Sequence, residues 1–295
     1  MKKKPETIRR VALVANPAKA ACREAVRLTS RLVRAAGREV WMDEATASLA
    51  CRPARLAPHA ADLADQADLL VVFGGDGTML RVAREVAGST TPILGINAGG
   101  LGFLTAVPLP QLQRALAEIW AGRYSLERRH LMSASGWARG RRVRQTALND
   151  FVIGRGGHSR MVELEVGVDG QVLTRYRCDG VIVSSPTGST AYSLAAGGAV
   201  VCPSARVFAL TPICPHTLSN RSVIISADSR IQVRPISSRI ETILTADGQV
   251  QIALAPEDSI VVQRSRQAIC LLHLAGSSFF ATLRQKLGWS GSHIV

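Results

Sequence analysis

The chain has 295 residues, of which 47% are hydrophobic and 20% are charged, and its formal net charge at pH 7 is +14. Its length predicts about two domains, and its balance of apolar and charged residues excludes an intrinsically disordered protein. No apolar run approaches the roughly 18 residues of a membrane-spanning helix, and the run at 11–14 is too short for a signal peptide, so we expect a soluble cytoplasmic protein.

The positive charge is carried mainly by arginine, since only five of the 36 basic residues are lysines. Such an excess attracts polyanions, whether nucleic acid, an acidic membrane or a phosphorylated small molecule, and charge alone does not choose among them. The six cysteines are scattered and form no Cys-x-x-Cys pair, which predicts reduced thiols and no fixed metal site.

Strands and helices alternate over the first part of the chain. Buried apolar runs predict strands at 11–15, 39–42, 69–73 and 92–96. Helical patterns cover 18–36, 78–87 and 109–121, and 45–52 has the composition of a loop. This alternation predicts a doubly wound α/β sheet, and we place the first domain at residues 1–126.

Beyond residue 126 the apolar pattern changes to a period of two. The alternating runs 161–168 and 171–177 flank Asp169-Gly170, a strong hairpin signal. A second hairpin is predicted around Arg139-Gly140, and further short strands at 181–183, 223–225, 231–234, 242–244 and 260–264. We therefore expect an all-β second domain over residues 127–275. In the tail, 276–295, Ser278 is placed to cap a helix that Gly288 ends.

The sharpest local signal is Gly74-Gly75-Asp76-Gly77-Thr78, between a predicted strand and a predicted helix. Glycines permit close backbone approach, and free N–H groups at a helix start favour an anion, so this turn predicts phosphate binding. A carboxylate repels phosphate, and Asp76 therefore has to act as a cap, a metal partner or a proton acceptor. A capped tight turn without function is the alternative interpretation.

Two more segments complete a candidate cleft. A second glycine-rich stretch, 95–105, also follows a strand, and both loops emerge at the carboxyl edge of the sheet, where ligands lie. Asn149-Asp150 offers an amide and a carboxylate that suit ribose hydroxyls, although a simple turn fits as well.

The densest stretch of small and polar residues is 178–198. Its hydroxyls predict a polar, uncharged binding surface, and Tyr192 either stacks on a flat ring or belongs to the core. Arg177 and Asp179 point to the same side of an extended chain. They either address phosphate and amide groups together or form a surface ion pair. The arginines at 139, 141, 142 and 144 fit a solvated hairpin.

In order and spacing, these segments resemble the NAD kinase family in its bacterial form. The resemblance rests on Gly-Gly-Asp-Gly-Thr at 74–78, Gly-Ile-Asn-x-Gly-x-Leu-Gly-Phe-Leu-Thr at 95–105, Asn149-Asp150, Asp179-Gly180, Pro-Thr-Gly-Ser-Thr-Ala-Tyr-Ser at 186–193, Pro-Ile-Cys-Pro-His at 212–216 and Asp247-Gly248-Gln249. The first motif alone is not specific, because lipid kinases share it. The whole set runs through nearly the entire chain.

The resemblance implies phosphoryl transfer from ATP, or from polyphosphate, to the 2′-hydroxyl of the adenosine ribose of NAD, which yields NADP. It implies that Mg²⁺ arrives on the nucleotide, and that neither nucleic acid nor a membrane is a partner. It also implies a Rossmann-like first domain, a β-sandwich second domain and a C-terminal helix that returns to the first domain. Members of the family are usually cytosolic homo-oligomers, so we expect a dimer or a tetramer.

The same resemblance assigns the site residues. Asp76 would accept the hydroxyl proton, Gly75, Gly77 and Arg81 would adjoin the phosphates, and Phe103 with Leu104 would lie against the adenine. Asn149 and Asp150 would hold ribose hydroxyls. The residues expected to line the dinucleotide are Arg160, Arg177, Asp179, Thr190, Ala191, Tyr192, Ser193, Leu194, Ala195 and Gln249.

Two other functions stay open at this point. A lipid kinase uses the same glycine loop as 74–78 but needs an apolar channel for its acceptor, whereas the segment 187–190 is polar. A non-catalytic module, either a nucleotide sensor or a polyanion binder, would use the net charge of +14. The carboxylate of Asp76 within an intact glycine loop argues against such a module.

Overall fold

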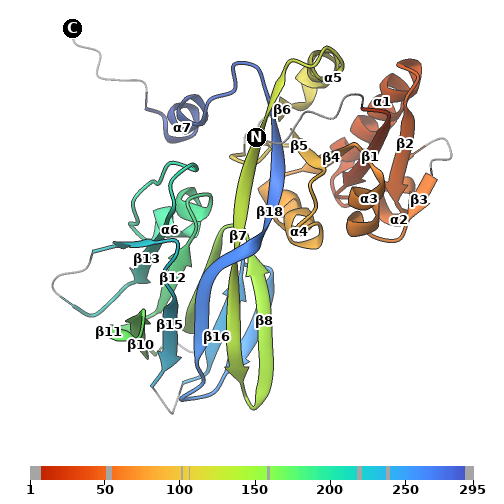
Figure 1. Cartoon of the computed structure of the whole chain (residues 1–295). Helices are drawn as coiled ribbons and strands as arrows, with labels where there is room; N and C mark the ends of the chain where they lie inside the picture. Colours follow the sequence, from red (N-terminus) through yellow and green to blue (C-terminus); the bar gives the residue numbers. More distant parts are fainter. Residues whose placement is uncertain are drawn as a thin grey trace, which may run out of the picture. The chain divides into compact units, whose positions relative to one another are not determined.

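A computed structural model describes residues 8–50, 55–100, 102–105, 107–157, 160–217, 221–236 and 240–289. The chain divides into two compact units, the first formed by residues 1–129 and 267–295 and the second by residues 130–266. Figure 1 traces both units along the chain. The sequence places the boundaries at 126 and 275 instead.

The first unit contains a parallel sheet in the order β5-β4-β1-β2-β3. Its strands are β1 (Arg10–Ala15), β2 (Glu39–Asp43), β3 (Arg55–Ala57), β4 (Leu69–Gly74) and β5 (Pro92–Asn97), with β6 (Val107–Pro108) paired to β5. Both β4 and β5 are buried along their whole length, as expected of central strands that are covered on both faces.

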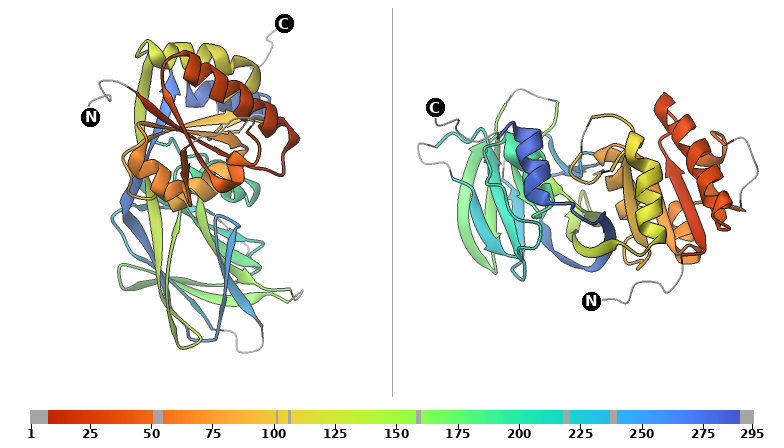
Figure 2. Two further views of the ribbon diagram at one scale, coloured as in Figure 1. Left: turned by 90° about the vertical axis from the view of Figure 1, so that its right-hand side faces the viewer. Right: turned by 90° about the horizontal axis from the view of Figure 1, so that it is seen from above.

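Helices cover both faces of this sheet, as Figure 2 shows in its left panel: α1 and α5 lie on one side, and α3 and α4 on the other. The helices of the unit are α1 (Ala20–Ala35), α2 (Glu44–Ala47), α3 (Ala60–Gln66), α4 (Asp76–Glu85), η1 (Leu109–Gln111), α5 (Leu112–Trp120) and α7 (Phe279–Leu287). The predicted α/β alternation is therefore confirmed. None of the helices among the described residues is both long and apolar enough to span a membrane.

One predicted loop is wrong in part, because α2, which begins at Glu44, covers the first three residues of the segment 45–52. The Asp43 carboxylate accepts a hydrogen bond from the Thr46 N–H at 2.8 Å and so caps a short helix. Asp43 is also the last residue of β2. The apolar pattern of that strand therefore hides the capping signal in the sequence.

The second unit is built from antiparallel strands. One sheet has the order β14-β13-β12-β9-β16-β17. Its strands are β9 (Asp150–Arg155), β12 (Gly180–Ser184), β13 (Val207–Ile213), β14 (Val223–Ser226), β16 (Thr242–Ala246) and β17 (Val250–Leu254). The short elements η2 (Gly188–Thr190) and α6 (Tyr192–Ala195) follow β12.

The other strands of this unit are β8 (Arg141–Ala147), β10 (Val162–Val168), β11 (Gln171–Cys178) and β15 (Ile231–Pro235), together with parts of β7 (Tyr124–Ala138) and β18 (Ile260–Leu274). One hydrophobic cluster joins buried side chains from these strands and from the six-stranded sheet, with Phe151 among its largest fully buried members. The second unit is thus β-rich, as the period of two predicts.

Three hairpins of the second unit turn on two residues that both have positive φ. They are Arg139-Gly140 (48° and 75°), Asp169-Gly170 (51° and 83°) and Asp247-Gly248 (50° and 64°). This geometry suits the right-handed twist of paired strands and requires Gly, Asn or Asp at one or both positions. The first two hairpins are confirmed as predicted.

The strands β7 and β18, each 15 residues long, carry the chain from one unit to the other. For β18, the sequence predicts only 260–264 as a strand, because the exposed pair Arg266 and Gln267 interrupts the alternating pattern. Hydrogen bonding continues past this interruption, and Cys270 pairs with Pro92 of β5. This continuity explains why the unit boundary lies at 266/267 and not after the strand.

Candidate active site

Three loops of the first unit follow the carboxyl ends of adjacent strands β1, β4 and β5. The sheet order changes direction between β1 and β4, since β2 and β3 extend on one side of β1 and β4 and β5 on the other. Ligands of doubly wound sheets bind outside the carboxyl ends of the strands at such a switch point. The loops concerned are 16–19, 74–76 and the described residues of 97–105.

The Asp76 carboxylate fastens two of these loops together. Its Oδ2 accepts a hydrogen bond from the Phe103 N–H at 2.8 Å. Its Oδ1 accepts from the N–H groups of Leu104 and Thr105, at 3.1 and 3.2 Å, and from the Thr105 hydroxyl at 3.2 Å. A carboxylate has about four lone-pair sites, and Oδ2 receives only one of these four donors.

Close packing around this carboxylate explains one glycine of the second motif. A Cβ atom at Gly102 would overlap both the Asp76 carboxylate and the Thr105 hydroxyl. The turn before it is held by Asn97, whose Oδ1 accepts from the Gly99 N–H at 2.7 Å and whose amide nitrogen donates to the Gly100 carbonyl. The two glycine loops therefore form one hydrogen-bonded assembly, as their predicted common edge requires.

The Gly-Gly-Asp-Gly-Thr turn leads directly into a helix, as the sequence predicts. Gly75 is the N-cap of α4 and Asp76 its first residue. A Cβ atom at Gly74 would overlap the Thr78 side chain, so the helix starts directly against the strand end. Gly77 is exposed in the first turn of α4.

Sequence reasoning missed Lys19, which belongs to the loop after β1. Its ammonium Nζ lies 3.3 Å from the position that a Cβ of Gly75 would occupy and 3.7 Å from that of Gly99. The available signal was its place directly after a buried strand, next to Asn16-Pro17.

Two other predicted residues of the first unit have partners within the protein. Arg81 forms an ion pair with Glu85 one turn along α4, with 2.7 Å between Nη1 and Oε1. The Phe103 ring lies 6.3 Å from the Phe279 ring of α7, centroid to centroid, and the Lys286 ammonium lies 4.7 Å from its centroid. Leu104 is buried, with 8% of its surface exposed.

In the second unit, Asn149 lies between β8 and β9 and Asp150 begins β9, and the Asp247 carboxylate holds the backbone of both residues. Asp247 accepts hydrogen bonds from the N–H groups of Leu148 at 3.1 Å, Asn149 at 2.8 Å and Asp150 at 3.3 Å. The Asn149 side-chain oxygen Oδ1 is buried and has no hydrogen-bond partner among the described residues. An orphaned buried acceptor is costly unless a ligand satisfies it.

The Asp150 carboxyl is 4% exposed and lies in the field of Asp247. Burial, and then repulsion by the Asp247 carboxylate, raise the pKa of Asp150 to about 7. Near neutral pH this group therefore changes between a hydrogen-bond donor and a pure acceptor.

The segment after β12 packs directly against Asn149. The Ser185 N–H donates to the Asn149 carbonyl at 2.8 Å, and a Cβ at Gly188 would overlap the Asn149 backbone. Several hydroxyls of this segment are used internally: Ser193 is fully buried and bonds to Thr211 at 3.0 Å. Tyr192 is 48% exposed and is not a core residue.

The remaining predicted residues of the segment and its surroundings are accessible to different degrees. Thr190, Ala191 and Leu194 are half-buried, whereas Ala195, Arg160, Arg177 and Gln249 are exposed. Asp179 pairs with Arg155, at 2.9 Å between Oδ1 and Nε, and not with Arg177. Asp179 pairs with Arg155 because it lies at the corner between β11 and β12, next to the neighbouring strand β9.

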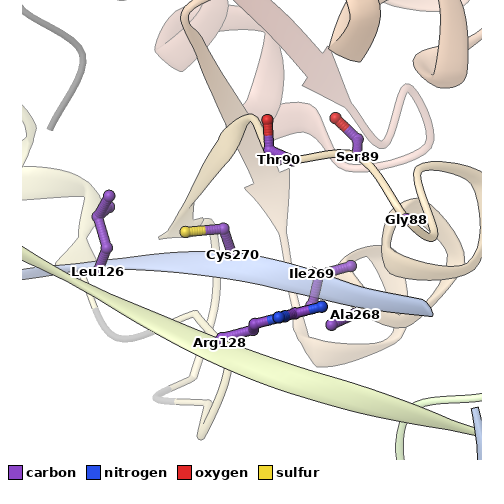
Figure 3. Close-up of a pocket in the computed structure, with 8 residues that line it drawn as sticks. All are labelled: Gly88, Ser89, Thr90, Leu126, Arg128, Ala268, Ile269 and Cys270. Atoms are coloured by element: carbon purple, nitrogen blue, oxygen red, sulfur yellow. The ribbon is translucent and has the colours of Figure 1, made fainter. Parts of the chain in front are cut away.

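Figure 3 shows a separate pocket of about 310 Å³ within the first unit. Its polar side chains are Ser89, Thr90, Arg128 and Cys270. None of the predicted site residues lines it. It adjoins the segment that follows α4 and precedes β5, at the opposite end of β5 from the glycine loops, and we do not count it in the candidate site.

Comparisons with known proteins agree with these motifs. Two family models match the chain: the ATP-NAD kinase N-terminal domain over residues 11–124 and the ATP-NAD kinase C-terminal domain over residues 148–274. An NAD kinase of Thiobacillus denitrificans is 43% identical over 229 residues, which are 77% of this chain and 79% of that protein.

Two solved structures resemble the fold over almost its whole length. Yeast NADH kinase complexed with NADH matches with a TM-score of 0.86 at 26% identity, covering 98% of this chain and 90% of that chain. An NAD kinase from Archaeoglobus fulgidus in complex with ATP matches with a TM-score of 0.75 at 26% identity, covering 96% of this chain and 100% of that chain.

The packing around Asp76 yields a stability prediction. Gly102→Ala forces a Cβ into the carboxylate and the Thr105 hydroxyl, and we expect a loss of about 1–3 kcal/mol in the free energy of unfolding. The control is Gly100→Ala in the same loop, where nothing lies within 4 Å of the added Cβ. Urea denaturation measures both variants, and equal losses would contradict the packing described here.

The raised pKa of Asp150 yields a pH prediction. Because this pKa is raised in the folded state, the folded protein binds more protons than the unfolded chain between about pH 4 and 7. The stability due to Asp150 is therefore complete below its unfolded pKa and is lost as the pH rises through 7. Asp150→Asn cannot ionise, and its free energy of unfolding should exceed that of the wild type by a few kcal/mol at pH 8.

This advantage should shrink steadily as the pH falls toward 4. The control is Asp169→Asn, in the hairpin turn between β10 and β11. A hydrogen bond from the Arg230 N–H and a second from Ser229 lower the pKa of Asp169, so its pH dependence should have the opposite sign. A constant difference between Asp150→Asn and the wild type would refute the assignment.

Proposed function

The chain belongs to the NAD kinase family, and from that premise we propose that it transfers the terminal phosphate of ATP to the 2′-hydroxyl of the adenosine ribose of NAD. The observation that carries the proposal is the pair of glycine loops tied together by Asp76 at the switch point of the sheet. A lipid kinase receives no support from the relatives compared above, which are named NAD or NADH kinases.

In this proposal the first unit supplies the phosphate site and the base. Phosphoryl transfer depends on positioning and on charge neutralisation more than on a strong base. The N–H groups at the start of α4, around Gly75 and Gly77, suit a phosphate, and Mg²⁺ enters with the donor as part of the substrate. The Asp76 Oδ2 atom, which among the described residues receives only the Phe103 N–H, accepts the proton of the ribose hydroxyl.

The second unit supplies contacts to the dinucleotide. Asn149 and Asp150 hold ribose hydroxyls, and the buried Asn149 oxygen, which no described residue satisfies, supports this role. The exposed Tyr192 ring is available to stack on a base. Further contacts proposed from the family pattern are Arg160, Arg177, Asp179, Thr190, Ala191, Ser193, Leu194, Ala195 and Gln249. For Ser193 the contact is assigned to the backbone, since its hydroxyl is bonded to Thr211.

Several finer features belong to the same proposal. The second unit is a β-sandwich, and α7 returns to the first unit, a placement that its ring contact between Phe279 and Phe103 supports. Polyphosphate serves as an alternative donor. The protein is a homo-oligomer of the cytoplasm, in which edge strands such as β14 are covered by a second copy.

The activity is tested by incubating the full chain with NAD, ATP and Mg²⁺ and measuring NADP with an NADP-specific dehydrogenase. We expect NADP to form in proportion to enzyme and time. Diacylglycerol offered in place of NAD should not be phosphorylated on thin-layer chromatography. Phosphorylated lipid without NADP would overturn the proposal in favour of a lipid kinase.

The role of Asp76 is tested by Asp76→Asn. Loss of a general base typically costs about 10²–10⁴ in rate, so kcat should fall by that factor while NAD still binds. The control is Thr105→Val, which removes one hydrogen bond to the same carboxylate and leaves the base in place; its kcat should fall less than tenfold. Equal losses in folded variants, as judged by thermal melting, would assign Asp76 a purely structural role.

A further inference from the structure

Lys19 places a positive charge between the two glycine loops of the first unit. Its ammonium lies within 3.3 and 3.7 Å of the points where Gly75 and Gly99 would carry a Cβ. Any larger residue at these two positions would therefore touch or displace the ammonium. The glycines leave open the space beside it, and Gly75 is also the N-cap of α4.

The ammonium has no carboxylate partner among the described residues, because no ion pair of Lys19 occurs there. The nearby carboxylate of Asp76 is engaged by loop 103–105. Lys19 is only partly exposed, as the N-cap of α1. A half-buried cation without a counter-ion, beside N–H groups at a helix start, favours an anionic ligand.

The residue type is informative as well. The chain uses arginine for nearly all of its basic positions, and apart from 2–4 only Lys19 and Lys286 are lysines. An ammonium is a compact point charge that binds phosphate without the planar fork of a guanidinium. A compact cation fits the narrow space between two loops that glycine keeps open.

We propose that Lys19 binds the phosphate chain of the donor, so that the phosphate site comprises three loops rather than the two glycine loops alone. The inference rests on the proposed kinase activity. It identifies the ligand of Lys19 as the triphosphate of the donor and not as the dinucleotide acceptor. Lys19 supplies the fixed positive charge that the Gly-Gly-Asp-Gly-Thr turn does not contain.

The test compares Lys19→Gln with Arg31→Gln, which removes an equal charge from an exposed position of the same helix, about 18 Å further along its axis. Inorganic tripolyphosphate, which has neither base nor ribose, is the binding probe, measured by calorimetry on the full chain. Lys19→Gln should weaken tripolyphosphate binding and raise the KM for ATP about ten- to hundredfold. The KM for NAD should change less than twofold, and Arg31→Gln should match the wild type.

Unchanged tripolyphosphate affinity in Lys19→Gln, or an equal loss in Arg31→Gln, would overturn the inference. Should Lys19→Gln fail to fold, tripolyphosphate must instead slow the acetylation of Lys19 in the wild type, and an unchanged rate overturns it. Failure of the kinase proposal looks different, since wild-type protein would then bind tripolyphosphate through Lys19 but form no NADP.

Discussion

The arrangement of the two glycine loops in the first unit depends on one carboxylate. Asp76 stands at the start of α4 and takes three consecutive backbone N–H groups and one hydroxyl from the segment 103–105, which follows the neighbouring strand. Those N–H groups belong to no helix or sheet ladder, and a buried N–H without an acceptor is costly. The same interaction requires glycine at 102, and in the proposed reaction Oδ2 also accepts the proton of the substrate hydroxyl. The Asp76 side chain therefore both stabilises the loop and takes part in the proposed reaction.

The second unit uses the same device at its own polar loop. Asp247 takes the three consecutive N–H groups of residues 148–150 and thereby orients Asn149 and Asp150. In both loops, three consecutive backbone N–H groups donate to one carboxylate. A carboxylate that collects successive amides gives such a loop a defined shape without filling it. This arrangement places a second carboxyl, that of Asp150, in a buried position beside Asp247, and the pKa of Asp150 rises to about 7 as a result.

Much of this arrangement follows from local sequence. Buried runs bounded by glycine predict β4 and β5, and Asp169-Gly170 predicts its hairpin, because each signal lies within a few adjacent residues. The partner of Asp179 does not follow in this way. Arg155 is distant in sequence and adjacent only through the pairing of β9 with β12. Lys19 was missed for the same reason, since only the order of the strands brings its loop next to Gly75 and Gly99. The short helix α2 was missed because its cap, Asp43, lies within a strand.

The central claim is that the Asp76 carboxylate holds the loop after β5, and amide hydrogen exchange measures this directly. In the wild-type protein without substrates, the N–H groups of Phe103, Leu104 and Thr105 should exchange far more slowly than in an unstructured chain. In Asp76→Ala these three should lose protection, while the N–H of Val86 at the end of α4, bonded to the Val82 carbonyl, should keep it. Fast exchange at 103–105 in the wild type, or equal protection in both proteins, would contradict the account.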